Sequence, residues 1–237
     1  RKGGNHPFSF YCEVIMRIIT PLKQLADHSD EWLSKDKPEW FKESDIDSLI
    51  STRFCPSFVE LFKNSLVFRA PADMRITLDE NQRNYTFHIA AAPLMRLSSH
   101  DLARQMNSNF AEKWESLKMS LPVTVLSDKV ESLIFMPSDY HLSDSPLQAM
   151  LGILETIPNK GQELTINFKV DKRMMYERNK WMISRGTPLA YFYFPNGAPK
   201  EVEYLSRDEF ESLTWIQTEF NCQYLRELTK AKKSLDT

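Results

Sequence analysis

Residues 117–136 read LKMSLPVTVLSDKVESLIFM, which is two apolar runs with a short polar interval between them. Both runs, 117–126 and 130–136, are rich in Val, Ile, Leu and Phe and have the length of a β-strand. Pro122 lies inside the first run, and a strand accommodates a proline at an edge or a bulge because proline donates no backbone hydrogen bond. The stretch therefore predicts two consecutive strands.

Runs of the same kind continue on both sides of this pair. They cover residues 7–19, 66–68, 74–78, 85–89, 150–156, 164–170 and 189–194. Proline and polar residues separate them, and the runs at 74–78 and 85–89 have the arrangement of a hairpin. Many short strands with turn residues between them favour an antiparallel β-sandwich or β-roll.

Helical patterns accompany the strands. Residues 21–63 mix aromatic and charged side chains, and Pro56 starts a segment with Phe58, Leu61 and Phe62 on one helix face. Residues 98–115 carry an apolar residue at every fourth position from Leu102 onwards. We therefore expect short helices within about 21–63 and a helix over about 98–115.

The clearest helical signal lies near the end of the sequence. Ser206 and Glu209 have the spacing of a capping box, in which each side chain bonds the backbone of the other residue. The residues that follow form one apolar stripe: Phe210, Leu213, Ile216, Phe220, Tyr224 and Leu228. This pattern predicts a long helix over about 207–230 that packs on the body.

The sequence has no linker rich in Gly or Ser and no internal repeat. We therefore expect one domain over residues 1–237, of the α+β class: an antiparallel β-sandwich or β-roll body, short helices near the N-terminus and a long C-terminal helix. With only 6 glycines, a phosphate-binding loop is disfavoured, and neither G-x-G-x-x-G nor G-x-x-x-x-G-K occurs.

Charge and cysteine content limit the environment and the partners. The 30 Lys and Arg and 32 Asp and Glu side chains give a net charge of -2, so no general positive field attracts nucleic acid or an anionic membrane. Three cysteines without a C-x-x-C pair favour a reducing compartment. No apolar run approaches the ~20 residues of a membrane span, and the first residues lack an apolar signal core. We expect an intracellular protein that binds neither membrane nor, in general, nucleic acid.

One stretch, residues 169–185, gathers basic side chains close to aromatic ones. The candidates for a binding surface are Lys172, Arg173, Trp181, Tyr191 and Tyr193. Tyr191 and Tyr193 share one strand face, with phenylalanines on the other, and we expect one of these faces to be partly exposed. The alternatives are a solvated charged hairpin and aromatic side chains that belong to the core.

Candidate catalytic groups are few. A metal site could be assembled from His88, His100 and His141, and ordinary hydrogen-bonded histidines are the alternative. Cys55 precedes Pro56 at the predicted helix start, where a thiolate would be stabilised, but we expect it to be a structural residue of that turn. No G-x-S-x-G motif occurs. We therefore expect no cofactor and no catalytic residue.

Two segments resemble a known group of proteins. RFCPSFVELFKNSLVFRAPAD at 53–73 and ISRGTPLA at 183–190 are similar to segments of uncharacterised proteins of tailed bacteriophages, including T4-like marine phages. The similarity runs over most of the chain. It implies a phage or phage-derived protein that works in the host cytoplasm or in a virion, and it implies no activity. Within the second segment, Gly186 is expected to permit a turn and Pro188 to begin the next strand.

A second resemblance is to the β-clip of trimeric dUTPase-like proteins. Gly152-Ile-Leu-Glu155 and Arg185-Gly-Thr187 follow the order of two glycine-containing segments in those proteins. The catalytic aspartate and the stacking tyrosine of the enzymes are not matched. This resemblance implies nucleotide hydrolysis as an alternative.

These observations favour a non-enzymatic, phage-encoded binding or structural protein that acts through protein–protein interaction with a phage or host partner. The alternative is an enzyme on a β-roll, either a metal-dependent oxygenase or a nucleotide hydrolase. A third class, nucleic-acid binding, requires the basic stretch 169–185 to lie beside exposed aromatic side chains.

Overall fold

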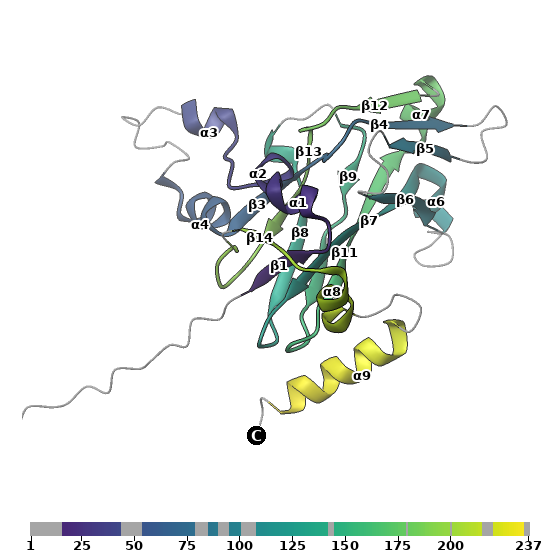
Figure 1. Cartoon of the computed structure of the whole chain (residues 1–237). Coiled ribbons are helices and arrows are strands. Elements are labelled where there is room, and N and C mark those ends of the chain that lie inside the picture. The colour runs from purple at the N-terminus through teal and green to yellow at the C-terminus, as the bar shows by residue number, and fades with distance from the viewer. Residues whose placement is uncertain are drawn as a thin grey trace, which may run out of the picture.

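The computed structural model describes residues 16–43, 54–78, 85–89, 95–100, 108–141, 145–178, 180–199, 201–214 and 220–234. Within these ranges the strands form three sheets, named A, B and C here, and short helices lie around them (Figure 1). The protein is therefore of the α+β class, as the sequence predicts. The predicted first strand is described from residue 16 onwards, and residues 7–15 lie outside the described ranges.

Sheet A is built around the long strand β7. Its path is β14 (Val202–Tyr204), β1 (Arg17–Thr20), β7 (Trp114–Leu126), β11 (Gln162–Asp171) and β9 (Gln148–Ala149), and β6 (Arg96–His100) also pairs with β7. Every pair is antiparallel except β1 with β14. The register of β11 against β7 shifts between Glu163 and Thr165, opposite Pro122. The proline therefore lies at an irregularity of the ladder, as its missing N–H requires.

Sheet B has five strands, all antiparallel. Their order is β10 (Gly152–Glu155), β8 (Ser132–Pro137), β13 (Pro188–Tyr193), β3 (Ser65–Arg69) and β2 (Leu33–Ser34). Sheet C is the hairpin of β4 (Met74–Leu78) and β5 (Tyr85–Ile89), with β12 (Lys180–Ile183) on the other side of β4. The predicted hairpin and the start of a strand at Pro188 are both confirmed.

The helices are short. They are α1 (Lys23–Asp27), α2 (Ser29–Trp32), α3 (Glu39–Glu43), α4 (Pro56–Asn64), α6 (Ser108–Lys113), α7 (Lys172–Arg178), α8 (Arg207–Leu213) and α9 (Phe220–Lys233), with the 3-10 helix η2 (Asp139–His141). Helix α4 begins at Pro56 as predicted, because proline has the backbone angle of a first helical residue and lacks an N–H that would have no partner there. None of the helices in the described ranges is long and apolar enough to cross a membrane.

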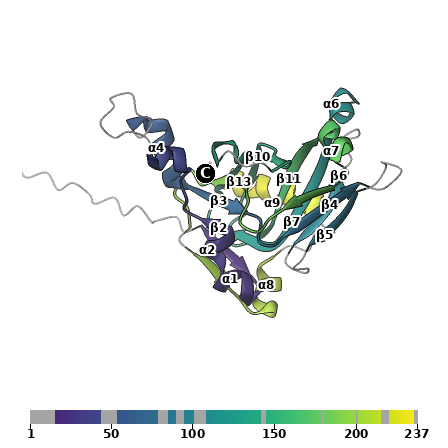
Figure 2. The ribbon, with the colours of Figure 1, turned by 90° about the horizontal axis from the view of Figure 1, so that it is seen from above.

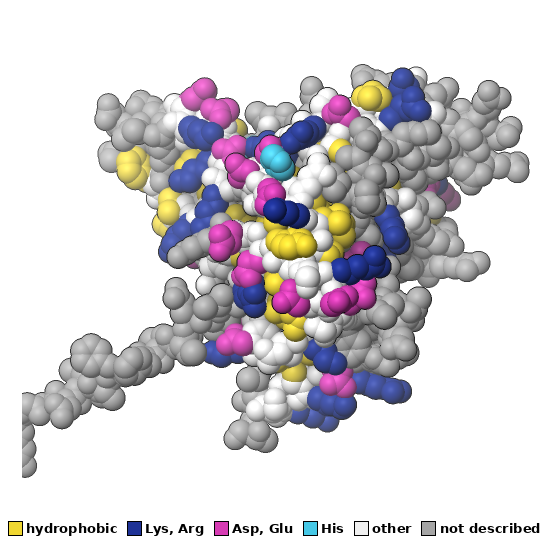
Figure 3. Space-filling view, in the orientation of Figure 1, with side chains coloured by type: hydrophobic (Ala, Val, Ile, Leu, Met, Phe, Trp, Pro, Cys, Tyr) yellow, Lys and Arg dark blue, Asp and Glu magenta, His cyan; other side chains and the backbone are white. Residues whose placement is uncertain are grey.

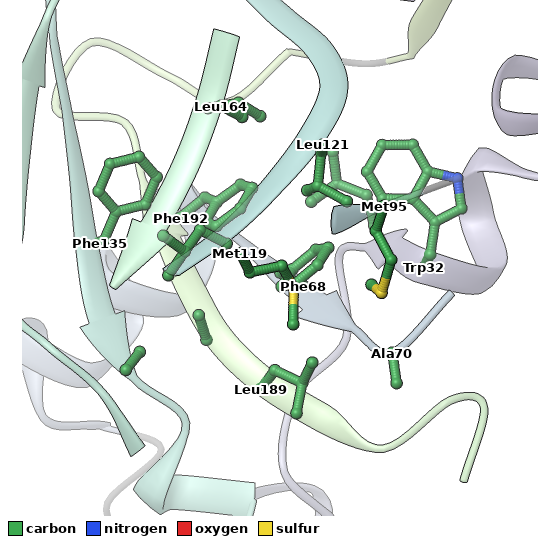
Figure 4. Close-up of a cluster of buried hydrophobic side chains, with 14 of the residues drawn as sticks. Trp32, Phe68, Ala70, Met95, Met119, Leu121, Phe135, Leu164, Leu189 and Phe192 are labelled. Atoms are coloured by element: carbon green, nitrogen blue, oxygen red, sulfur yellow. The ribbon is translucent and has the colours of Figure 1, made fainter. Parts of the chain in front are cut away.

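Side chains of sheets A and B meet in one core. Met119 and Leu121 of β7 lie against Phe68 of β3 and Phe192 of β13 (Figure 4). The ring of Phe192 stacks on Phe68 and meets the edge of Phe135, with centroids 5.3 Å apart in both pairs. Burial of each such side chain contributes about 1.5–3 kcal/mol, so this core holds the two sheets together.

The predicted helix over about 98–115 is wrong at both ends, where residues 98–100 and 114–115 lie in strands. Arg96–His100 is strand β6, paired with β7, and within the described residues helix α6 covers Ser108–Lys113. Trp114 already begins β7. The apolar residues spaced by four begin only at Leu102, so that pattern carries no information about residues 98–100, which pair with β7 as part of a strand. Residues 101–107 lie outside the described ranges.

The predicted long C-terminal helix is also corrected. Helix α8 ends at Leu213, because Thr214 is extended (φ -105°, ψ 152°) and forms a bridge with Gly161. The N–H of Gly161 donates to the Leu213 carbonyl at 2.7 Å, which ties the end of the helix to the body. Helix α9 begins at Phe220, and residues 215–219 lie outside the described ranges. The capping box of Ser206 and Glu209 is present as predicted.

Candidate functional site

The outer face of sheet B, turned away from sheet A, carries apolar side chains in rows that cross the strands. Tyr193 of β13 is opposite Ile134 of β8, and Ile134 is opposite Ile153 of β10. A second row consists of Val67, Tyr191 and Met136. Directly opposed residues of antiparallel strands point to the same face, so the two rows form one continuous apolar surface.

This surface is buried at one side of the sheet and exposed at the other. Val67 and Tyr191 are 1% and 0% exposed, whereas Ile153 on the edge strand is 66% exposed. Leu151, which directly precedes β10, is 72% exposed. We name the uncovered part the open face; it consists of Ile134, Leu151, Ile153 and Tyr193.

Aromatic side chains of α3, α4 and η2 cover the other part. Phe41 and Phe62 pack against Val67 and Tyr191. The rings in contact with one another are those of Trp40, Phe41, Phe58, Phe62 and Tyr140, with the closest centroids 4.8 Å apart. In Figure 2, α4 lies to the left of β3 and β13, and β7 and β11 lie to their right. Sheet B is therefore covered on both faces near β3, whereas Ile153 of β10 is exposed.

A charged network fixes this aromatic cover to the sheet. Arg69, at the end of β3, donates to Asp36 at 2.5 Å and to the carbonyl of Gly186 at 2.9 Å. Lys42 of α3 reaches the same carboxylate at 3.0 Å. Burial alone would raise the pKa of Asp36, but the hydrogen bond from Lys42 and the charges of Lys42 and Arg69 outweigh burial and lower it. Gly186 has φ 85°, which confirms the predicted turn.

His141 and Tyr191 are the titratable pair beneath the cover. Their rings stack with centroids 5.4 Å apart and an angle of 28° between planes. Burial, assisted by the charge of Arg69, lowers the pKa of His141 from 6.5 to about 4, and burial raises the pKa of Tyr191. Both side chains are therefore neutral at pH 7. The His141 Nε2 atom and the Tyr191 hydroxyl are buried and have no hydrogen-bond partner among the described residues.

The open face ends at β10, which is the last strand of sheet B in the part of the chain that the structure describes and pairs there with β8. Its Glu155 forms an ion pair with Lys232 of α9 at 2.7 Å, which balances the charge at this end of the strand. Exposed apolar side chains on a sheet edge promote association with other chains, so their presence marks a candidate interaction site.

A pocket of about 240 Å³ lies between α2, β2 and the segment before β14. Leu33, Leu66 and Val202 line it together with charged residues of both signs, Asp30, Lys35 and Glu201. Pockets for small-molecule ligands usually measure about 300–1,000 Å³. The pocket is small for a nucleotide, and its mixed charge favours no one class of ligand.

The candidate metal ligands lie on separate elements. His88 is on β5 of sheet C, His100 on β6 of sheet A, and His141 in η2 beside sheet B. The sequence also contains His28-Ser29-Asp30, the His-x-Asp spacing found in some iron enzymes, but His28 lies at a helix start and contacts Glu31 at 3.1 Å. In the parts of the chain that the structure describes, no group of three or more His, Cys, Asp and Glu residues is placed to hold a metal ion.

The predicted basic surface is largely neutralised by its neighbours. The ammonium group of Lys172 donates to the carbonyl of Ala111 at 2.6 Å and lies 3.7 Å from Glu115. Arg173 is paired with Asp171 at 3.0 Å. Figure 3 shows Lys and Arg interspersed with Asp and Glu over one face of the molecule. These contacts give no support to a polyanion-binding patch.

The burial of Trp181 and Tyr191 corrects the predicted aromatic surface. Trp181 is 7% exposed and belongs to the core between the sheets, and Tyr191 is fully buried under α3 and α4. Tyr193 is half-buried on the open face. Strand alternation shows which residues share a face, but it does not show that helices from another part of the chain cover that face.

Cys55 lies directly before α4 and is half-buried, with a free thiol. Its side chain does not cap the helix. The geometry gives this thiol no role beyond its place in the turn.

No model of a known protein family matches the sequence, and no curated protein matches it. The function therefore has to be inferred from the surfaces described above. The residues that matter most there, Leu151 and Ile153, lie in the run 150–156 that the sequence predicts as a strand. Nothing in that run indicates an edge position, because strand order depends on distant segments.

Proposed function

We propose that the protein is a non-enzymatic binding protein that acts through protein–protein interaction, and that the open face is its binding surface. The observation that carries this proposal is the exposure of two aliphatic side chains, Leu151 at 72% and Ile153 at 66%, at the edge of a sheet. Clustered apolar side chains on a protein surface commonly mark interaction sites. The resemblance to proteins of tailed phages supports a phage or host protein as the partner, in the host cytoplasm or in a virion.

The core that sheets A and B share supports a β-sandwich as the body of the protein. In a sandwich, the outer face of sheet B is held rigid by the core beneath it. A rigid apolar surface loses little conformational freedom when a partner binds, which favours affinity.

The alternative is an enzyme, a nucleotide hydrolase or a metal-dependent oxygenase. The observation in its favour is the buried pair His141 and Tyr191, whose polar atoms have no partner among the described residues. Buried polar atoms without a partner can mark a site that a ligand completes. Release of phosphate or pyrophosphate from a nucleotide, abolished in His141→Gln at unchanged stability, would favour this alternative.

The proposed function can be tested by selecting binders from a library of displayed random peptides. The affinity of independent binders is then measured for the wild type, for Ile153→Lys and for the matched variant Met182→Lys. Met182 is 60% exposed on β12, an edge strand of sheet C, so it controls for the loss of an exposed apolar group. We expect most binders to lose affinity for Ile153→Lys only. Binders whose affinity does not depend on Ile153, or that bind in the pocket near Leu33, would contradict the proposal.

A further inference from the structure

The open face lies about one helix spacing away from α4. Neighbouring strands lie about 4.8 Å apart, so the pair β8 and β10 is centred two strand steps, about 9.6 Å, from the pair β3 and β13. Helices that pack side by side are about 8–10 Å apart. Helix α4 already packs over β3 and β13. The surface over β8 and β10 therefore has room for one further helix beside α4.

The contact made by α4 shows what kind of surface fits this sheet. Phe58, Leu61 and Phe62, at positions i, i+3 and i+4 of the helix, pack toward Val67 and Tyr191. The open face is the neighbouring row on the same side of sheet B, formed by Tyr193, Ile134 and Ile153, and it is apolar in the same way. A second helix with an apolar stripe would therefore find contacts similar to those that hold α4.

Addition of a strand to β10 is less favourable. The strand has 4 residues, and the chain leaves sheet B before it, where the N–H of Met150 donates to Asn167 of β11 at 2.8 Å. A strand added to so short an edge gains few backbone hydrogen bonds, and short edge strands are one way in which proteins avoid strand addition. The side chains of the open face, rather than the β10 backbone, offer most of the available contact.

We infer that the open face binds an amphipathic helix of a partner protein, which packs across β8 and β10 beside α4. This inference rests on the proposed function and specifies the partner. The helix buries Ile134, Ile153 and Tyr193 under an apolar stripe of period 3.6, and its polar side faces solvent. The ion pair of Glu155 and Lys232 lies at the end of this surface, where the polar flank of the helix can meet it.

The test uses two fluorescent synthetic peptides of about 14 residues, with the same composition of Leu, Glu and Lys, a length that is marginal for an isolated helix. In one peptide the leucines recur with period 3.6, and in the other they alternate with period 2. Binding of each to the full chain is measured by anisotropy, and far-UV circular dichroism reports the helicity of the peptide. The proteins are the wild type, Ile153→Lys and Met182→Lys, each checked by its melting temperature.

We expect the period-3.6 peptide to become helical on binding and to bind Ile153→Lys at least about tenfold more weakly than the wild type, with Met182→Lys unchanged. Preferential, Ile153-dependent binding of the alternating peptide would overturn the helical partner and leave the proposed function standing. If neither peptide shows binding that depends on Ile153, the helical partner is wrong. A simultaneous absence of Ile153-dependent binders from the displayed library would show that the proposed function fails as well.

Discussion

Acidification should destabilise the protein through His141. Its pKa is about 4 in the folded state, lowered by burial and by Arg69, and about 6.5 in the unfolded chain. Above pH 6.5 the imidazole is neutral in both states, so its full contribution to stability is present. As the pH falls from 6.5 toward 4, the unfolded state takes up the proton and the folded state does not, so stability is lost.

The size of this effect follows from the two pKa values. The whole difference corresponds to about 3.4 kcal/mol, of which about 2 kcal/mol would be lost between pH 7.5 and 5.0. His141 is only partly buried, and solvent screening reduces the effect, so we expect about 1 kcal/mol over this range. The negative charge of Asp36 favours the imidazolium form of His141 in the folded state. Like solvent screening, it makes the loss of stability smaller.

Urea denaturation at pH 7.5 and 5.0 measures this loss, with His141→Gln as the variant that cannot titrate at this position. The difference in unfolding free energy between the two pH values should be about 1 kcal/mol smaller in His141→Gln than in the wild type. The same pH dependence in both proteins would refute the burial of a neutral imidazole beneath the aromatic cover. A gain in stability at pH 5.0 that the wild type shows and His141→Gln does not would refute it more strongly.

Three further substitutions test the packing. Gly161→Ala should lower the unfolding free energy by about 1–3 kcal/mol, because a Cβ would overlap the Thr124 methyl group, whereas Gly152→Ala meets only ordinary contacts; urea denaturation compares them. Ser206→Ala should cost about 1 kcal/mol by removing the capping box, and an unchanged unfolding midpoint would show that α8 does not depend on its cap. Tyr191→Phe should leave the melting temperature unchanged or raise it, because the hydroxyl has no partner among the described residues; a marked fall would reveal a hydrogen bond that stabilises the fold.

The strands were the most predictable part of the structure. The run 117–126 predicts strand β7, and the adjacent runs 74–78 and 85–89 predict the hairpin of β4 and β5. These features depend on residues close in sequence, where periodicity acts directly. The capping box of Ser206 was predictable for the same reason.

Features that depend on distant contacts were not predictable. The apolar stripe continues past Leu213, yet the helix stops there because Gly161, 52 residues earlier in the chain, binds its last carbonyl. Tyr191 was a candidate surface residue, but α3 and α4 cover its strand face. The run that contains Leu151 and Ile153 predicts a strand and nothing about its position, and only the strand order of sheet B places Ile153 at an exposed edge.

The most direct test of the open face as a binding surface is hydroxyl-radical footprinting of the full chain, free and with a saturating selected binder. Mass spectrometry then gives the oxidation rate of individual side chains. We expect the binder to slow the oxidation of Leu151, Ile153 and Tyr193 severalfold and to leave the rate at Met182 unchanged. Unchanged oxidation at Leu151 and Ile153 in the presence of bound peptide would contradict the proposal that this surface is the binding site.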